Sequence, residues 1–117
     1  MIKNRDGRFV LPTLDSVAAA LASIAASAPK DLRLNAINAS GSGSYPISTA
    51  TYILVYRDQT DPAKAQALVR MLWWSTHDAQ AASEPLHYGR LPSVITSRTE
   101  GLIKSITANG KPVSSIL

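Results

Sequence analysis

Apolar residues recur along three stretches of the chain at the three- and four-residue spacing of an amphipathic helix. The first stretch follows Pro12 and ends by Pro29. Thr13 is its expected N-cap, and Asp15 suits the positive end of the helix. The apolar positions of this predicted helix are Leu14, Val17, Ala18, Leu21, Ile24 and Ala25.

The second and third helices have equally clear starts. Asp61 can accept hydrogen bonds from free amide groups, and Pro62 fits the first helical position. The third helix is expected to start near Pro92, with Gly101 weakening its middle where another backbone comes close. The predicted inner face of the second helix is Ala65, Leu68, Val69, Leu72, Trp73 and Thr76, with Trp74 beside it. That of the third is Leu91, Val94, Ile95, Leu102, Ile103 and Ile106.

The intervening segments predict short strands and turns. In residues 47–56, β-branched and aromatic residues first alternate with polar ones and then form a continuous apolar run, which predicts a central strand buried on both faces. Shorter strands are expected at residues 9–11 and 31–37. A turn is expected at residues 4–7, and residues 38–44 predict a flexible loop of small polar residues. The chain ends in a turn after Ala108 and an extended tail.

Composition narrows the class of protein. Of the 117 residues, 45% are hydrophobic and 17% charged, which is typical of a folded chain and not of a disordered one. Twelve basic and eight acidic residues give a net charge of +4 without an evident basic cluster. There is no cysteine, so disulfides and thiol catalysis are excluded. The sequence predicts no membrane insertion, because its apolar runs are too short, and no signal peptide.

Residues that could carry catalysis are few. His77 and Asp78 are adjacent on a predicted helix and therefore point in different directions, so a helix-end histidine is the simpler interpretation. His87 has no second histidine at metal-ligand spacing. No serine stands in a Gly-x-Ser-x-Gly motif. We therefore expect no enzyme, no metal site and no cofactor.

Three motifs in order along the chain carry a resemblance to a known family. Residues 6–13 read DGRFVLPT, residues 44–59 read SYPISTATYILVYRDQ, and residues 86–92, which follow the helix with Trp73 and Trp74, read LHYGRLP. Together they resemble the carboxyl-terminal part of the phosphate-binding proteins that serve ABC transporters. The resemblance implies an α/β fold with about three helices and a few short strands, forming part of a two-lobed, type II-like periplasmic-binding-protein clamp.

The resemblance also implies a division of the chain. Residues 1–40 resemble the second lobe, 41–46 the crossing between lobes and 47–106 the first lobe, and the tail 107–117 returns to the second. In that family, phosphate is held by amides, hydroxyls, an arginine and an aspartate from segments that nothing here matches. We therefore expect no phosphate-binding residue in this chain. The alternative is a glycine-rich anion loop, with contacts from Ser42, Gly43 and Ser44. It lacks the helix and lysine of a phosphate loop, which favours a hinge or linker.

The expected function is that of a fragment of a periplasmic or extracellular receptor, which delivers inorganic phosphate to an ABC permease without catalysis. The alternative is a stand-alone assembly module that does not bind phosphate. Its apolar helix faces predict burial against another copy or against a complementing amino-terminal fragment, and the sequence does not choose between them. Nucleic-acid binding is disfavoured, because the arginines are not clustered and no recognition motif is present.

Overall fold

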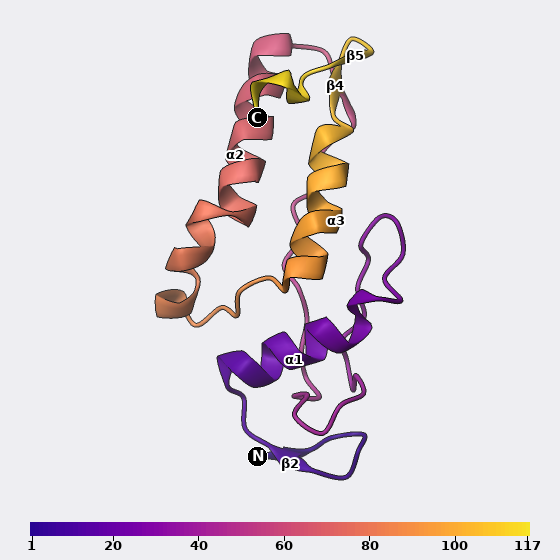
Figure 1. Cartoon of the computed structure of the whole chain (residues 1–117), viewed down its shortest axis with the longest axis vertical. Coiled ribbons are helices and arrows are strands. Elements are labelled where there is room, and N and C mark those ends of the chain that lie inside the picture. The colour runs from indigo at the N-terminus through magenta and orange to yellow at the C-terminus, as the bar shows by residue number, and fades with distance from the viewer.

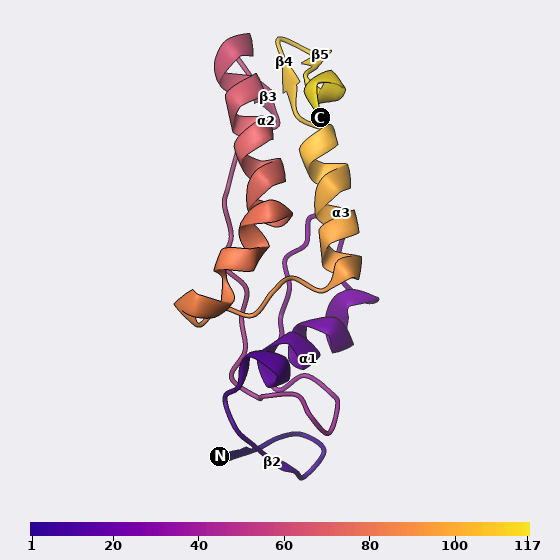
Figure 2. The ribbon, with the colours of Figure 1, turned by 60° about the vertical axis from the view of Figure 1, so that its left-hand side comes forward.

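The computed structural model describes residues 1–117 as an elongated chain measuring 51 × 28 × 18 Å. Its three α-helices lie in two groups (Figure 1). Helices α2 and α3 run side by side at one end, and α1 lies across the other end beside the N-terminal hairpin. Figure 2 shows the same arrangement after a turn of 60°. The helices are α1 (Leu14–Ala25), α2 (Pro62–Thr76) and α3 (Ser93–Lys104), with 3₁₀ turns η1 (Asp78–Ala82), η2 (Glu84–Leu86) and η3 (Ser114–Ile116).

The first two helices start at the N-cap residues that the sequence predicts. Thr13 and Ser16 form a reciprocal capping box, in which the Ser16 amide donates to Thr13 Oγ1 at 3.2 Å and the Thr13 amide donates to Ser16 Oγ at 3.0 Å. At the start of α2, Asp61 Oδ1 accepts from the amides of Ala63 at 2.9 Å and Lys64 at 3.2 Å. The expected N-caps are therefore confirmed. Helix α1 ends at Ala25, about one turn earlier than predicted.

Buried apolar side chains form two separate clusters, and α3 contributes to both. Ile103, near its end, belongs to the larger cluster, whose other members are Ala65, Val69, Leu72, Ile106, Ala108 and Val113. Ile95, near its start, packs with the smaller one, whose other members are Ala25, Ala28 and Leu32. The predicted inner face of α3 was wrong at Val94 and Leu102, which are exposed. Ile95 and Ile103 pack into different clusters, so no single apolar stripe of α3 is buried along its whole length.

Five two-residue strands form two small sheets. They are β1 (Ile2–Lys3), β2 (Phe9–Val10), β3 (Asp58–Gln59), β4 (Thr107–Ala108) and β5 (Lys111–Pro112). β1 and β2 pair antiparallel around the predicted turn, where Gly7 has a φ of +79°. The second sheet has the order β3-β4-β5, with β3 parallel to β4 and β4 antiparallel to β5. Three helices with short strands confirm the predicted α/β class.

Two predicted strands and one predicted close contact are absent. Residues 47–56 belong to no sheet, Ile47 lies in a bend, and only Asp58–Gln59 of that region forms a strand. Residues 31–37 form no strand either, and Leu32 has a φ of +57°. A Cβ at Gly101 would meet nothing within 4 Å, whereas one at Gly89 would lie 3.4 Å from the Leu14 carbonyl oxygen. The two segments meet through a side chain, since the Tyr52 hydroxyl accepts from the Leu34 amide at 2.8 Å and donates to the Leu34 carbonyl at 3.2 Å. A strand needs a neighbouring backbone for its ladder of hydrogen bonds, and neither segment has one here.

Asp58 joins the second sheet to the turn between β4 and β5. Its Oδ1 accepts from Thr107 Oγ1 at 2.6 Å and from the Gly110 amide at 2.9 Å. These two bonds, that of Thr107 foremost, hold the pKa of Asp58 below its ordinary value of 3.8. Since the folded state favours the ionised carboxyl, its contribution to stability is present above pH 3.8 and is lost as the pH falls through the lowered pKa.

We therefore expect Asp58→Asn to be less stable than the native chain at pH 7, and the difference to shrink as the pH is lowered below about 4. Chemical unfolding of both proteins at pH 7, 5 and 3 measures this difference. Asp78→Asn is the matched control, because the exposed Asp78 side chain makes no hydrogen bond. A stability difference that is the same at all three pH values would contradict the expectation.

Candidate functional site

The glycine-rich loop at residues 40–44 is organised around the buried side chain of Asn4. Asn4 Nδ2 donates to the carbonyl oxygens of Gly41, Ser42 and Ser44, each at 3.1 Å. Asn4 Oδ1 accepts from the amides of Asp6 at 3.1 Å and Arg8 at 3.0 Å. One side chain therefore joins the N-terminal hairpin to a loop about 40 residues away.

Further bonds fix the same loop. The Gly41 amide donates to Asp6 Oδ2 at 3.0 Å, and the Ser44 amide donates to the Gly41 carbonyl at 2.9 Å. Ser44 Oγ donates to the Ser40 carbonyl at 2.8 Å, and the Tyr45 amide donates to the Ser16 carbonyl at 3.0 Å. Ser44 is buried, so the prediction that this loop has nothing to bury was wrong. The sequence analysis predicted only a turn at Asn4, because long-range hydrogen bonds are not visible from a local turn motif.

The loop mainly presents groups that accept hydrogen bonds. Three carbonyl oxygens converge on Asn4, and the Asp6 carboxylate already occupies the place where an anion would receive the Gly41 amide. Ser42 and Gly43 are exposed at the loop's tip. Carbonyl and carboxylate oxygens repel an anion, so the geometry favours a joint between two segments.

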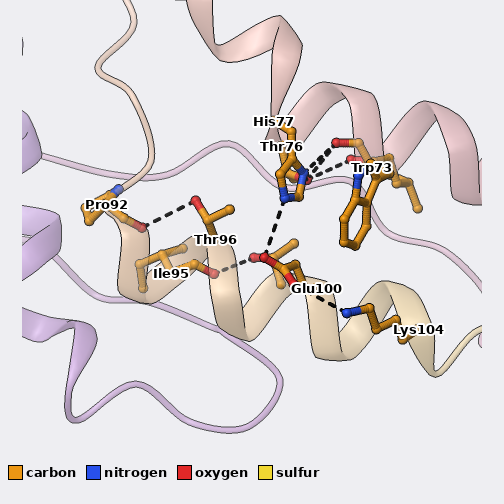
Figure 3. Close-up of polar contacts among 10 residues, drawn as sticks. Trp73, Thr76, His77, Pro92, Ile95, Thr96, Glu100 and Lys104 are labelled. Atoms are coloured by element: carbon orange, nitrogen blue, oxygen red, sulfur yellow. Dashed lines mark hydrogen bonds and ion pairs between the residues drawn. The ribbon is translucent and has the colours of Figure 1, made fainter. Parts of the chain in front are cut away.

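A second polar cluster links α2 to α3 (Figure 3). The rings of Trp73 and His77 stack with centroids 4.2 Å apart and planes 13° from parallel. His77 Nδ1 lies 2.9 Å from the Trp73 carbonyl oxygen and 3.1 Å from Thr76 Oγ1. On α3, Glu100 Oε1 lies 3.5 Å from His77 Nε2, and Glu100 Oε2 lies 3.4 Å from Lys104 Nζ. Lys104 Nζ also lies 5.2 Å from the centroid of the Trp73 ring.

The polar groups of this cluster have their hydrogen-bond and ion-pair partners within the cluster. The Trp73 carbonyl oxygen can only accept, so Nδ1 of His77 carries a hydrogen, and a second hydrogen on Nε2 would complete an ion pair with Glu100. The expected helix-end position of His77 is confirmed, since it caps α2. The polar partners of the imidazole are Trp73, Thr76 and Glu100, and the adjacent Asp78 is not one of them. We interpret the cluster as a link between two helices.

Arg98 is a contact that the sequence did not reveal. Its Nη1 donates to the Ala25 carbonyl oxygen at 2.9 Å, which also accepts from the Ala28 amide at 3.3 Å, and this bond ties α3 to the end of α1. Helix-terminal carbonyls favour cations, but the sequence does not show which of the many basic residues will reach one. His87 lies apart from all these contacts, in a turn with a φ of +61°.

Three other properties bear on the class of protein. No group of three or more histidine, cysteine, aspartate or glutamate side chains is arranged to hold a metal ion. None of the helices combines the length and apolar character needed to cross a membrane. The mixed α/β arrangement, with three helices and short strands, is consistent with part of a periplasmic-binding-protein fold.

Sequence comparisons then specify the family. No protein-family model matches the chain. The phosphate-binding protein PstS of Xylella fastidiosa is 31% identical over 99 residues, which are 85% of this chain and 27% of the relative. PstS of Methanocaldococcus jannaschii is 31% identical over 90 residues, or 68% of this chain and 23% of the relative. PstS of Pasteurella multocida is 24% identical over 104 residues, or 89% and 30%.

These matches confirm the resemblance predicted from the sequence. The chain corresponds to a part of the phosphate-binding proteins of the PstS family, and it spans about a quarter of the length of the curated relatives that it matches.

Proposed function

We propose that this chain is part of an extracytoplasmic receptor that binds inorganic phosphate and delivers it to an ABC permease, without catalysis. The observation that carries the proposal is the match over 85% of the chain to a protein named for phosphate binding. In this proposal the chain acts outside the cytoplasm.

The proposal assigns a supporting role to these residues. Residues 1–40 and 107–117 would belong to the second lobe of the clamp, 47–106 to the first, and 41–46 to the crossing between them. The groups that hold phosphate would come from segments other than these. The network around Asn4 supports this assignment, because the hydroxyl and the carbonyl of Ser44 are both bonded within it. Of the three alternative anion contacts, only Ser42 and Gly43 remain.

Calorimetric titration of inorganic phosphate tests the proposal, with sulfate as the control anion. We expect the 117-residue chain alone to give no binding heat. Co-expressed with the Xylella fastidiosa relative from which the 99 matched residues are deleted, it should give one phosphate site per complex. Tight binding by the chain alone would instead point to Ser42, Gly43 and Ser44.

A second candidate, an assembly module that does not bind phosphate, is supported by the exposed apolar side chains. Eighteen large hydrophobic residues are exposed, among them Leu54 and Tyr56. This candidate predicts association of the chain without any phosphate heat, either alone or in the complex. The titration therefore separates the two candidates.

A further inference from the structure

One asparagine of this chain is followed by glycine. Asn109 precedes Gly110, whereas the other three asparagines precede arginine or alanine. The backbone nitrogen after an asparagine can attack the side-chain carboxamide and close a five-membered ring. Glycine permits this attack most readily, because it has no Cβ to crowd its nitrogen. The sequence therefore contains one chemically labile pair.

The pair forms the turn between β4 and β5. Ala108 pairs with Lys111, so Asn109 and Gly110 are the two residues of a tight hairpin turn. Their φ angles are +50° and +76°, and a type I′ turn, which favours Asn-Gly, requires positive φ at both positions. Both residues are exposed, at the end of the molecule far from α1 (Figure 1). Solvent therefore has access to the pair.

Asp58 holds the nitrogen that would attack. The Gly110 amide donates to Asp58 Oδ1 at 2.9 Å. This amide becomes a nucleophile only when it loses its hydrogen. A carboxylate beside it opposes that loss, because it binds the hydrogen and because its negative charge disfavours a second negative charge nearby. Thr107 Oγ1 donates to the same oxygen at 2.6 Å, which fixes the carboxylate in place.

Thr60 holds the group that would be attacked. Asn109 Nδ2 donates to the Thr60 carbonyl oxygen at 3.2 Å, and the Asn109 amide donates to the Gln59 carbonyl at 2.9 Å. Ring closure needs a rotation that brings Asn109 Cγ to the Gly110 nitrogen, and the bond to Thr60 restrains this rotation. Both reacting groups are thus attached to residues 58–60, about 50 positions earlier in the chain.

We propose that Asn109 is a site of spontaneous deamidation, and that Asp58 and Thr60 slow the reaction by holding its two reacting groups. Hydroxide removes the hydrogen of the Gly110 amide, and the nitrogen forms a bond to Asn109 Cγ. The bond from Cγ to Nδ2 then breaks, and Nδ2 takes a proton from water and leaves as ammonia. Water opens the resulting succinimide at either carbonyl, which gives aspartate or isoaspartate at position 109. The net reaction consumes one water and releases one ammonia.

Either product disturbs the second sheet. Aspartate replaces the donor at the Thr60 carbonyl by a carboxylate, which that oxygen repels. Isoaspartate adds a methylene group to the main chain, so the turn no longer fits the pairing of Ala108 with Lys111. Ala108 belongs to the larger apolar cluster, so the modification also loosens the packing around it.

Incubation of the full chain at pH 8, with and without urea, tests the inference. The tryptic peptide of residues 105–117 contains Asn109, and its mass and isoaspartate content report the reaction. We expect modification to be at least tenfold slower in the folded chain than in urea. Asn38 is the matched control, because it also has a φ of +50° in the folded chain but precedes alanine. In urea it should react at least tenfold more slowly than Asn109.

Two variants test the role of Asp58. Asp58→Ala removes the acceptor of the Gly110 amide and should accelerate the modification of the folded chain at least fivefold. Thr107→Val removes a hydroxyl that donates to Asp58 but keeps the bond to Gly110, so its rate should stay within twofold of the native rate. Circular dichroism checks that each variant is folded. If Asp58→Ala does not fold, the uncharged Asp58→Asn takes its place and should accelerate the reaction at least twofold.

The outcomes are distinct. Acceleration at Asp58 alone, with slow reaction in the native chain, would support the inference. Equal rates with and without urea, no modification even in urea, or a reaction that is not faster without the Asp58 carboxylate would each overturn it. So would equal acceleration in Thr107→Val, because lost stability would then explain both rates. No arm of this experiment involves phosphate, so the inference stands or fails separately from the proposed function.

Discussion

Replacing Ile103 by alanine is expected to lower the free energy of unfolding by about 2–5 kcal/mol. Ile103 is 3% exposed and stands in the larger apolar cluster, where α3 meets Val69 and Leu72 of α2. Removing its side chain loses buried methylene groups and leaves a cavity between the two helices. Because the clusters are small, a single loss of this size is a large part of the total stability of the chain. Urea unfolding followed by circular dichroism measures the change.

Leu102 provides the matched control, because it precedes Ile103 in the same helix but is 40% exposed. Leu102→Ala should change the free energy of unfolding by less than about 1 kcal/mol. If Ile103→Ala does not fold at all, Ile103→Val should still show a loss of about 0.5–1.5 kcal/mol. Equal effects at Leu102 and Ile103 would contradict the arrangement of α2 and α3.

Replacing Asn4 by alanine is expected to cost about 2–3 kcal/mol, since it removes a donor from three carbonyl oxygens and an acceptor from two amides. The Ser44 carbonyl is the most affected, because its bond to Asn4 is buried. Without the side chain, the loop at residues 40–44 loses its attachment to the N-terminal hairpin. Hydrogen exchange should therefore accelerate in both segments and not in α2.

Two further variants make this test specific. Asn4→Asp keeps the acceptor for the amides of Asp6 and Arg8 but places a carboxylate against the carbonyl oxygens, so it should destabilise the chain at neutral pH as much as alanine does. Asn35→Ala, at an exposed asparagine that accepts from the Ile37 amide, should have a small effect. Fast amide exchange at residues 40–44 of the native chain would contradict the proposed attachment of this loop to the N-terminal hairpin. So would an exchange rate in these segments that is unchanged in Asn4→Ala.

Contacts of α3 show how the two ends of the molecule are held together. Ile95 packs against the end of α1, and Arg98 donates to the Ala25 carbonyl. Further along the same helix, Glu100 and Ile103 contact α2. A short helix with a different neighbour at each end explains why its predicted inner face was only partly correct.

Local chemistry in the sequence determined the helix starts and the turns. The capping box of Thr13, the Asp61-Pro62 start and the turn at Gly7 all depend on groups within a few residues of one another, and all are confirmed. The family resemblance was also evident from ordered motifs, and the sequence comparisons confirm it. These features require no knowledge of distant neighbours.

Only the tertiary structure decided the features that depend on distant partners. Residues 47–56 have the composition of a central strand, yet they remain unpaired here because a strand needs neighbours to receive its hydrogen bonds. Asn4 fixes a loop about 40 residues away, and Arg98 reaches the end of α1 across more than 70 residues. The sequence by itself thus determined the helices, turns and family of this chain. The long-range hydrogen bonds and the unpaired segment became visible only once the elements were placed in space, because each depends on which groups meet and which find no partner.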